Sequence, residues 1–230
     1  MKKVSAIICV LNEEKTLRNV IMAVCEDSSI NEIVVVNDGS TDNTQNIINE
    51  LQQFIEIKDI HLAENKGKGY AMAVGAENAT GEILVFIDAD QTTIIPGYID
   101  QIVNPILRHE CDMVCGYSTV NIMNQDVNPL KILTGERAFL KKDIAPILDR
   151  IKESRFGVET LFYFYYTSIG KSIKFVRLGI KHDNKYKKMP PLQATTNYIC
   201  ESWEIAYAAM KNYDLILKSA EKKIRKGLRR

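Results

Sequence analysis

The stretch Ile83-Leu84-Val85-Phe86-Ile87-Asp88-Ala89-Asp90 (residues 83–90) is the most informative part of this sequence. Five consecutive apolar residues, β-branched and aromatic types among them, predict a strand buried on both faces, as in a parallel sheet. Two carboxylates, Asp88 and Asp90, follow at the point where that strand ends. A buried strand that ends on paired acids predicts an α/β protein with a site at the carboxyl edge of its sheet.

Short apolar runs alternate with helical patterns through the first half of the chain. Strands are predicted over residues 4–10, 32–36, 57–63 and 83–87. Helices are predicted over residues 16–25, 41–53 and 69–79. Continuous apolar strands separated by helices predict a mainly parallel central sheet with helices on both faces.

The second half of the chain is less regular. Strands are predicted near residues 112–116 and 173–178. Helices are predicted over residues 143–151 and 158–168 and from about residue 195 to the end. Since there is no linker, internal repeat or low-complexity stretch, we expect residues 1–230 to form a single domain.

Composition narrows the class of protein. The chain has 230 residues and a formal net charge of +1, so no basic field points to nucleic acid as the main partner. Its five cysteines are scattered and odd in number, which predicts reduced, mostly buried thiols in a reducing compartment. We see no signal peptide and no apolar run of ~18 residues, so we expect a cytoplasmic protein.

Polar loops follow each of the first four predicted strands. They cover residues 12–14, 37–42, 65–69 and 88–90, and are acidic or rich in Gly and Lys. Because the carboxyl ends of parallel strands meet at one edge of a sheet, these loops should converge. Their composition predicts a site for an anionic, metal-bound ligand.

The Asp-x-Asp triplet suits a hard divalent cation. Mg²⁺ and Mn²⁺ take oxygen ligands and share them with the oxygens of a diphosphate, so Asp88 and Asp90 predict either ion. Asp38, before a predicted helix, is free to accept from a base N–H or a ribose hydroxyl. The loop over residues 65–69 suits phosphate or ribose at a helix start. The alternatives are a surface turn at residues 88–90 and solvated lysines in the Gly-rich loop.

The order of three segments carries a family resemblance. Val-Leu-Asn-Glu-Glu (10–14), the NDGSTDNT run (37–44) and NKGKGYAMAVGAENATGEILVFIDAD (65–90) resemble the nucleotide-binding half of family-2-type glycosyltransferases. That group includes dolichyl-phosphate sugar synthases and glucosyl-3-phosphoglycerate synthases. Shorter matches lie at residues 135–139 and 156–159, and a last one at 178–184. The resemblance implies a GT-A (Rossmann-like) three-layer sandwich, with a nucleotide-binding half over 1–92, an acceptor-side half over 93–194 and a C-terminal helical segment over 195–230.

The resemblance also implies roles on the nucleotide side. Leu11, Asn12 and Glu13 should line the nucleoside pocket. Asp38 should contact the base, and Lys68 should reach the ribose or the diphosphate.

Further roles concern the metal and the acceptor. Asp88 and Asp90 should hold nucleotide and metal, with Asp90 the direct ligand and His182 completing the metal shell. Glu159 should face the acceptor, as a general base for a hydroxyl or as an orienting group for a phosphate. Arg137 has the geometry to bind an acceptor phosphate bidentately, and the alternative is a structural ion pair.

The predicted activity is metal-dependent transfer of a hexose from a nucleoside-diphosphate sugar. A UDP-sugar is favoured over a GDP-sugar, and the acceptor is a lipid phosphate, a small phosphorylated acid or a hydroxyl. A nucleotidyltransferase is the first alternative, but it normally has a Gly-rich loop where residues 12–14 stand. A non-catalytic sugar-nucleotide-binding module is the second, but it would be expected to lose Asp90 or Glu159.

The end of the chain is basic and amphipathic. From residue 215 onward, Leu and Ile residues are interleaved with Lys and Arg. Such a helix can lie on an anionic membrane, which would make the protein peripheral at the inner face of the membrane. The alternative is a solvated terminal helix.

Overall fold

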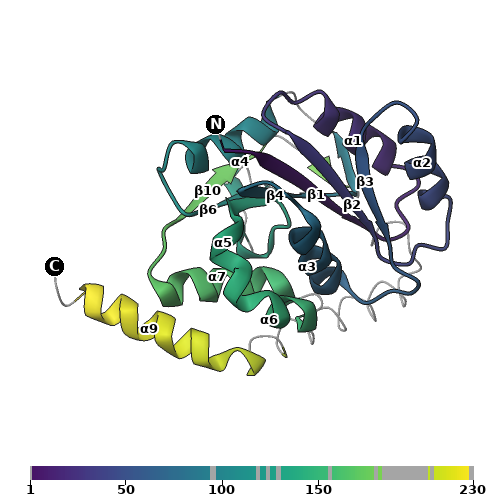
Figure 1. Ribbon diagram of the computed structural model, residues 1–230. Coiled ribbons are helices and arrows are strands. Elements are labelled where there is room, and N and C mark those ends of the chain that lie inside the picture. Colours follow the sequence, from purple (N-terminus) through teal and green to yellow (C-terminus); the bar gives the residue numbers. More distant parts are fainter. Residues whose placement is uncertain are drawn as a thin grey trace.

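In the computed structural model, helices pack against both faces of one central sheet (Figure 1). The structure describes residues 2–93, 97–117, 120–122, 125–127, 131–154, 157–178, 181–182, 207 and 210–227. Within these ranges, no helix has both the length and the apolar character needed to cross a membrane.

The central sheet has seven strands in the order β10-β6-β9-β4-β1-β2-β3. In chain order these are β1 (Val4–Val10), β2 (Glu32–Asn37), β3 (Ile57–His61), β4 (Ile83–Asp88), β6 (Met113–Tyr117), β9 (Arg137–Leu140) and β10 (Ile173–Arg177). Two small antiparallel pairs lie outside it: β5 (Gln91–Thr93) with β11 (Lys181–His182), and β7 (Val120–Ile122) with β8 (Gln125–Val127).

The strand order places the site. Strands β3, β2, β1 and β4 are mutually parallel, and β9 runs antiparallel between β4 and β6. The chain first builds outward from β1 to β2 and β3, and then returns to add β4 on the other side of β1. The strand order therefore reverses between β1 and β4, and ligands of open α/β sheets bind beyond the carboxyl ends of the strands at such a point.

Two apolar cores lie on the two faces of the sheet. One face is covered by α1 (Leu17–Cys25), α2 (Thr44–Leu51) and α4 (Tyr98–Leu107). The other is covered by α3 (Lys68–Asn78), α5 (Lys141–Ile144), α6 (Leu148–Glu153) and α7 (Val158–Ile169), with α9 (Tyr213–Gly227) packed on α7. Within β1, Ala6 and Ile8 face the first core and Ile7 the second, which explains why this strand is apolar without alternation.

The structure confirms the α/β fold class and the strand and helix pattern of the first half. Differences arise in the second half. The helix expected over residues 143–151 is divided into α5, a 3₁₀ turn (Ala145–Ile147) and α6, because Pro146 lacks the N–H that would continue the ladder. The sequence analysis did not predict α4 or β9. Another short 3₁₀ turn spans Lys131–Leu133.

The cysteine prediction is confirmed in one respect and wrong in another. Cys9, Cys25, Cys111 and Cys115 are free thiols, but only Cys115 is fully buried; Cys9 and Cys111 are partly buried, and Cys25 is exposed. Cys200 lies outside the described residues.

The close approach of α3 to the sheet gives a test of the packing. A Cβ at Gly75 would lie 2.5 Å from Cγ2 of Ile7. We expect Gly75→Ala to lower the free energy of unfolding by about 1–2 kcal/mol in urea denaturation, because overpacking exceeds the gain in helix propensity. In an Ile7→Ala background the same substitution should cost nothing, and equal costs in both backgrounds would contradict the packing argument.

Candidate active site

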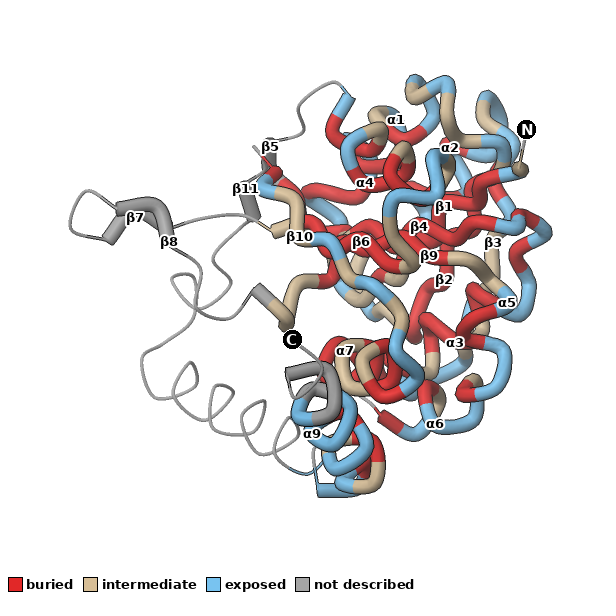
Figure 2. Tube along the Cα trace, turned by 90° about the vertical axis from the view of Figure 1, so that its left-hand side faces the viewer, coloured by how far each residue is buried: buried red, intermediate tan, exposed pale blue. Residues whose placement is uncertain are grey.

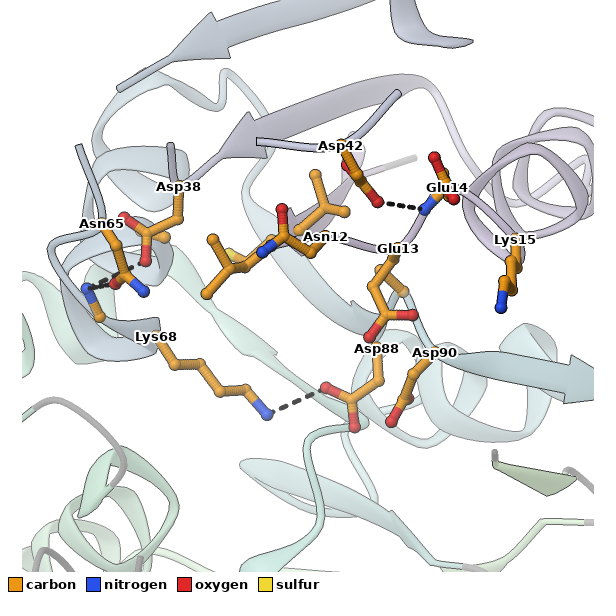
Figure 3. Close-up of a pocket in the computed structure, with 16 residues that line it drawn as sticks. Asn12, Glu13, Glu14, Lys15, Asp38, Asp42, Asn65, Lys68, Asp88 and Asp90 are labelled. Carbon is orange, nitrogen blue, oxygen red and sulfur yellow. Dashed lines mark hydrogen bonds and ion pairs between the residues drawn. The ribbon is translucent and has the colours of Figure 1, made fainter. Parts of the chain in front are cut away.

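A pocket of about 660 Å³ lies at the carboxyl ends of the parallel strands, where the strand order reverses (Figure 3). Its walls come from the loops after β1, β2, β3 and β4. Of the residues expected at the site, it is lined by Leu11, Asn12, Glu13, Asp38, Lys68, Asp88 and Asp90. The structure therefore brings together the four loops that the sequence singled out.

The loop after β1 is anchored on the loop after β2. Asn12 adopts a left-handed conformation with φ of 57°. Its N–H donates to Oγ of Ser40 at 3.0 Å, and its Oδ1 accepts from the N–H of Thr41 at 2.8 Å. The N–H of Glu13 donates to Oγ1 of Thr44 at 3.1 Å. These exchanges offset the cost of the left-handed backbone and fix the direction of the Glu13 side chain.

The expectation that Asp38 is free to accept from a ligand is wrong in this structure. Its carboxylate is 4% exposed and accepts from the N–H groups of Lys66 and Gly67 at 2.8 and 2.9 Å. The two loops approach so closely that a Cβ at Gly39 would lie 2.6 Å from the backbone of Glu64. Asp38 thus holds the Gly-rich loop in place, and its contact with a base stays a prediction.

Three carboxylates gather on the opposite wall of the pocket. Figure 3 shows Glu13 pointing towards Asp88 and Asp90. Among the described residues, no group of three or more His, Cys, Asp or Glu side chains is arranged to hold a metal ion. The oxygen donors suit Mg²⁺ or Mn²⁺, which keep several ligands from water or from phosphate oxygens. Asp88 and Asp90 are the residues that would hold such an ion.

His182 enters the site only through its backbone. It belongs to β11, which pairs with β5 so that His182 lies opposite Gln91, one residue after Asp90. Its side chain lies outside the described part of the structure, so its role as a metal ligand stays a prediction.

Lys68 links the two sides of the site. From the first turn of α3, its ammonium reaches Oδ1 of Asp88 at 3.0 Å and Oε1 of Glu159 at 2.9 Å. Burial alone would lower the pKa of Lys68, but the two carboxylates raise it well above its usual value. Lys68 is therefore a positive charge at neutral pH, held between the Asp88 carboxylate and the first turn of α7.

A thiol lies on the floor of the same pocket. Burial raises the pKa of Cys9 well above its usual value, the Asp88 and Asp38 carboxylates raise it further, and Lys68 offsets part of the effect. Cys9 is therefore a neutral thiol at physiological pH, which makes it a wall of the pocket rather than a nucleophile.

Gly135 is a contributor that the sequence analysis did not single out by itself. It precedes β9, and a Cβ there would lie 2.1 Å from both carboxylate oxygens of Asp88. The backbone at this point forms a surface against which the Asp88 carboxylate rests. The sequence showed this glycine as the first residue of the segment 135–139. Its contact with Asp88 could not be read from the sequence, because that contact results from the pairing of β9 with β4.

Arg137 does not reach the pocket, contrary to the expectation that it binds an acceptor phosphate. It is fully buried, and its guanidinium donates to the carbonyl oxygens of Thr134 and, at 3.4 Å, Glu159. The guanidinium carbon lies 5.1 Å from the ring centre of Phe162. Arg137 therefore supports the turn that carries Glu159.

Glu159 stands at the inner edge of the site. Its side chain is 8% exposed, and it meets the pocket through the Lys68 ammonium. The residue before the glycine of its motif, Phe156, lies outside the described residues. The acceptor role of Glu159 stays a prediction.

A sheet that reverses its strand order above a pocket at its carboxyl edge places the protein in the class of doubly wound α/β proteins. Residues 5–174 match the sequence profile of Glycosyl transferase family 2. The chain belongs to that family.

Relatives in sequence match part of this chain. An uncharacterized glycosyltransferase from Nostoc sp. is 43% identical over 91 residues, which cover 38% of this chain and 28% of that protein. A dolichyl-phosphate beta-glucosyltransferase from Trichomonas vaginalis is 31% identical over 131 residues, covering 51% of this chain and 40% of that protein. The chain thus spans less than half the length of these curated relatives.

Solved structures share the fold. Glucosyl-3-phosphoglycerate synthase from Mycobacterium tuberculosis, in complex with Mn²⁺, UDP and phosphoglyceric acid, superimposes with a TM-score of 0.72 at 20% identity, covering 91% of this chain and 78% of that one. This similarity confirms the GT-A-like architecture.

The charge on Lys68 can be measured directly. We expect Asp88→Asn to lower the pKa of Lys68, and the double change with Glu159→Gln to lower it below the usual lysine value, because burial then acts unopposed. The stability from these ion pairs is complete below the ordinary value of about 10.4 and is lost as pH rises through the raised pKa. NMR titration of labelled lysine ammonium groups gives the values. Glu64→Gln, which removes the partner of Lys66, is the matched control and should leave Lys68 unchanged.

The surface under Asp88 gives a second test. Gly135→Ala should push the Asp88 carboxylate out of place and lower the affinity for UDP in the presence of Mn²⁺ at least tenfold, or about 1.4 kcal/mol, by isothermal titration calorimetry. Gly97→Ala is the control, because it adds strain at a φ of +76° in open space without touching the pocket. Unchanged affinity in Gly135→Ala would mean that the Asp88 position is not critical.

Proposed function

We propose that this chain transfers a hexosyl group from a nucleoside-diphosphate sugar, preferably a UDP-sugar, to a phosphate-bearing acceptor, with Mg²⁺ or Mn²⁺ bound at Asp88 and Asp90. The observation that carries the proposal is the pocket itself, in which Glu13, Asp88 and Asp90 face the Lys68 loop across the carboxyl edge of the sheet. Family membership and the UDP and Mn²⁺ named for the structural neighbour support it.

Each side chain has a place in such a reaction. The divalent ion would act as a Lewis acid that stabilises the departing diphosphate. Lys68 adds a second fixed positive charge, and because it is already placed and partly buried, it needs little reorganisation as charge develops. Glu13 and Asn12 are held by the β2 loop and form the nucleoside side of the pocket.

Glu159 belongs to the acceptor side. A phosphate acceptor is already anionic and needs no base, so Glu159 would orient it together with Lys68. A hydroxyl acceptor would instead need Glu159 as a general base. We favour the phosphate because the named relatives act on dolichyl phosphate or are bound to phosphoglyceric acid. The proposal also includes a single glycosyltransferase domain over residues 1–230 and a cytoplasmic location at the inner face of a membrane.

The rival functions make different predictions. A nucleotidyltransferase is disfavoured by membership in a glycosyltransferase family. A binding module without catalysis would retain nucleotide binding and show no turnover of any nucleotide sugar.

The donor and the metal are tested together by thermal unfolding. With UDP-glucose at 100 times its dissociation constant and Mn²⁺ present, the free energy of unfolding should rise by about 2.7 kcal/mol. For a chain of this size that is a rise in Tm of roughly 5–10 °C. Asp90→Asn should abolish the metal-dependent part, and Asp149→Asn, at an exposed position in α6, should keep it.

The panel should include GDP-, dTDP- and CDP-sugars with and without Mn²⁺. If only a GDP-sugar raises Tm, the base of the donor is guanine instead of uracil, and the proposed mechanism is unchanged. No shift with any nucleotide, in either condition, would refute the proposed function.

A further inference from the structure

Helix α9 has two different faces. One face packs on α7 through Asn212, Leu215 and Ser219, which are 2–6% exposed. Oγ of Ser219 lies 2.7 Å from Oγ1 of Thr167, so this face is fixed by a hydrogen bond as well as by apolar contact. The helix is therefore already anchored to the protein and does not need its other face for folding.

The opposite face of α9 carries exposed apolar side chains. Figure 2 shows exposed residues, in pale blue, along this helix. Tyr213, Leu217 and Ile224 are 65%, 58% and 63% exposed, and Ala220 between them is also exposed. Their spacing of 4, 3 and 4 residues puts them in one stripe along the helix. Met210, 71% exposed, precedes this stripe. Apolar side chains gathered in this way on a surface mark an interaction site.

The stripe lies in a basic segment. Residues 211–227 contain six Lys and Arg against two acidic residues. One of those acids, Asp214, is paired with Arg150 at 3.2 Å and so contributes little negative charge outward. Lys218 is exposed, whereas Lys211 is paired with Glu153, and the ammonium of Lys222 lies beside Gly170 at the end of α7.

We propose that the outer face of α9 binds the surface of an anionic lipid bilayer. A line of exposed apolar side chains on a helix whose sequence carries a net positive charge is the combination that inserts at the headgroup boundary, where the stripe is buried and the positive charge is attracted. The same spacing would also suit a second copy of α9, but a self-paired α9 would bring two basic helices together. The charge therefore favours the bilayer as the occupant.

The contact would orient the site. Ser219 lies beside Thr167 and Lys222 beside Gly170, so α9 and α7 run in the same direction. The start of the stripe therefore lies towards the end of α7 that carries Glu159. If the proposed function holds, a lipid phosphate acceptor would enter from the side that α9 holds at the membrane; the binding itself does not depend on that function.

Vesicle flotation tests the surface. The full chain should bind vesicles of phosphatidylcholine with 30% phosphatidylglycerol at least tenfold more tightly than pure phosphatidylcholine vesicles. Leu217→Glu with Ile224→Glu should reduce that binding at least tenfold, while the matched pair Met22→Glu with Phe54→Glu, which also removes two exposed apolar side chains, should not.

Three results would overturn the proposal. They are equal binding to neutral and anionic vesicles, unchanged binding by the α9 double variant, and a dimer in light scattering that the α9 variant converts to a monomer. The UDP and Mn²⁺ thermal shift is measured on the same variants. If the α9 double variant still binds UDP but no longer binds vesicles, the result supports the outer face of α9 as the membrane-binding surface. If the wild-type protein does not bind UDP, only the proposed function is refuted.

Discussion

Asp88 and Glu159 come from β4 and from the first turn of α7, and the ammonium of Lys68 stands between them. Two carboxylates brought this close in a partly buried site would repel each other, so the lysine is what allows the end of β4 and the start of α7 to meet. The charge must also be placed from a fixed element, and the start of α3 provides one.

The main chain then fixes the surrounding loops. Asp38 accepts from two consecutive N–H groups of the Gly-rich loop, and Asn12 exchanges hydrogen bonds with Ser40 and Thr41. Some polar side chains after the strands therefore hold the loops of the pocket in place, and others face into the pocket. A pocket built by hydrogen bonds between side chains and the backbone is pre-organised, so binding a ligand there needs little ordering of the loops.

The donor half of the site was predictable from sequence because its signals are local. Each strand ends next to the loop that it supplies, and a parallel sheet brings those ends together whatever the details of packing. The alternation of apolar strands and helices was enough to locate Asp88, Asp90 and Lys68. What the sequence did not contain was how each side chain is used: Asp38 was expected to be free, and it is engaged with backbone N–H groups.

The acceptor half depends on contacts between residues far apart in the chain. Gly135 matters because β9 enters the sheet antiparallel beside β4, and a four-residue strand gives little periodicity to recognise. Arg137 looked like a phosphate ligand because of its charge, but the same strand directs its guanidinium into the core against Phe162. In the first half of the site, neighbouring strand ends meet by the topology of the sheet, whereas the contact of Glu159 with Lys68 depends on how α7 packs against α3 and β9.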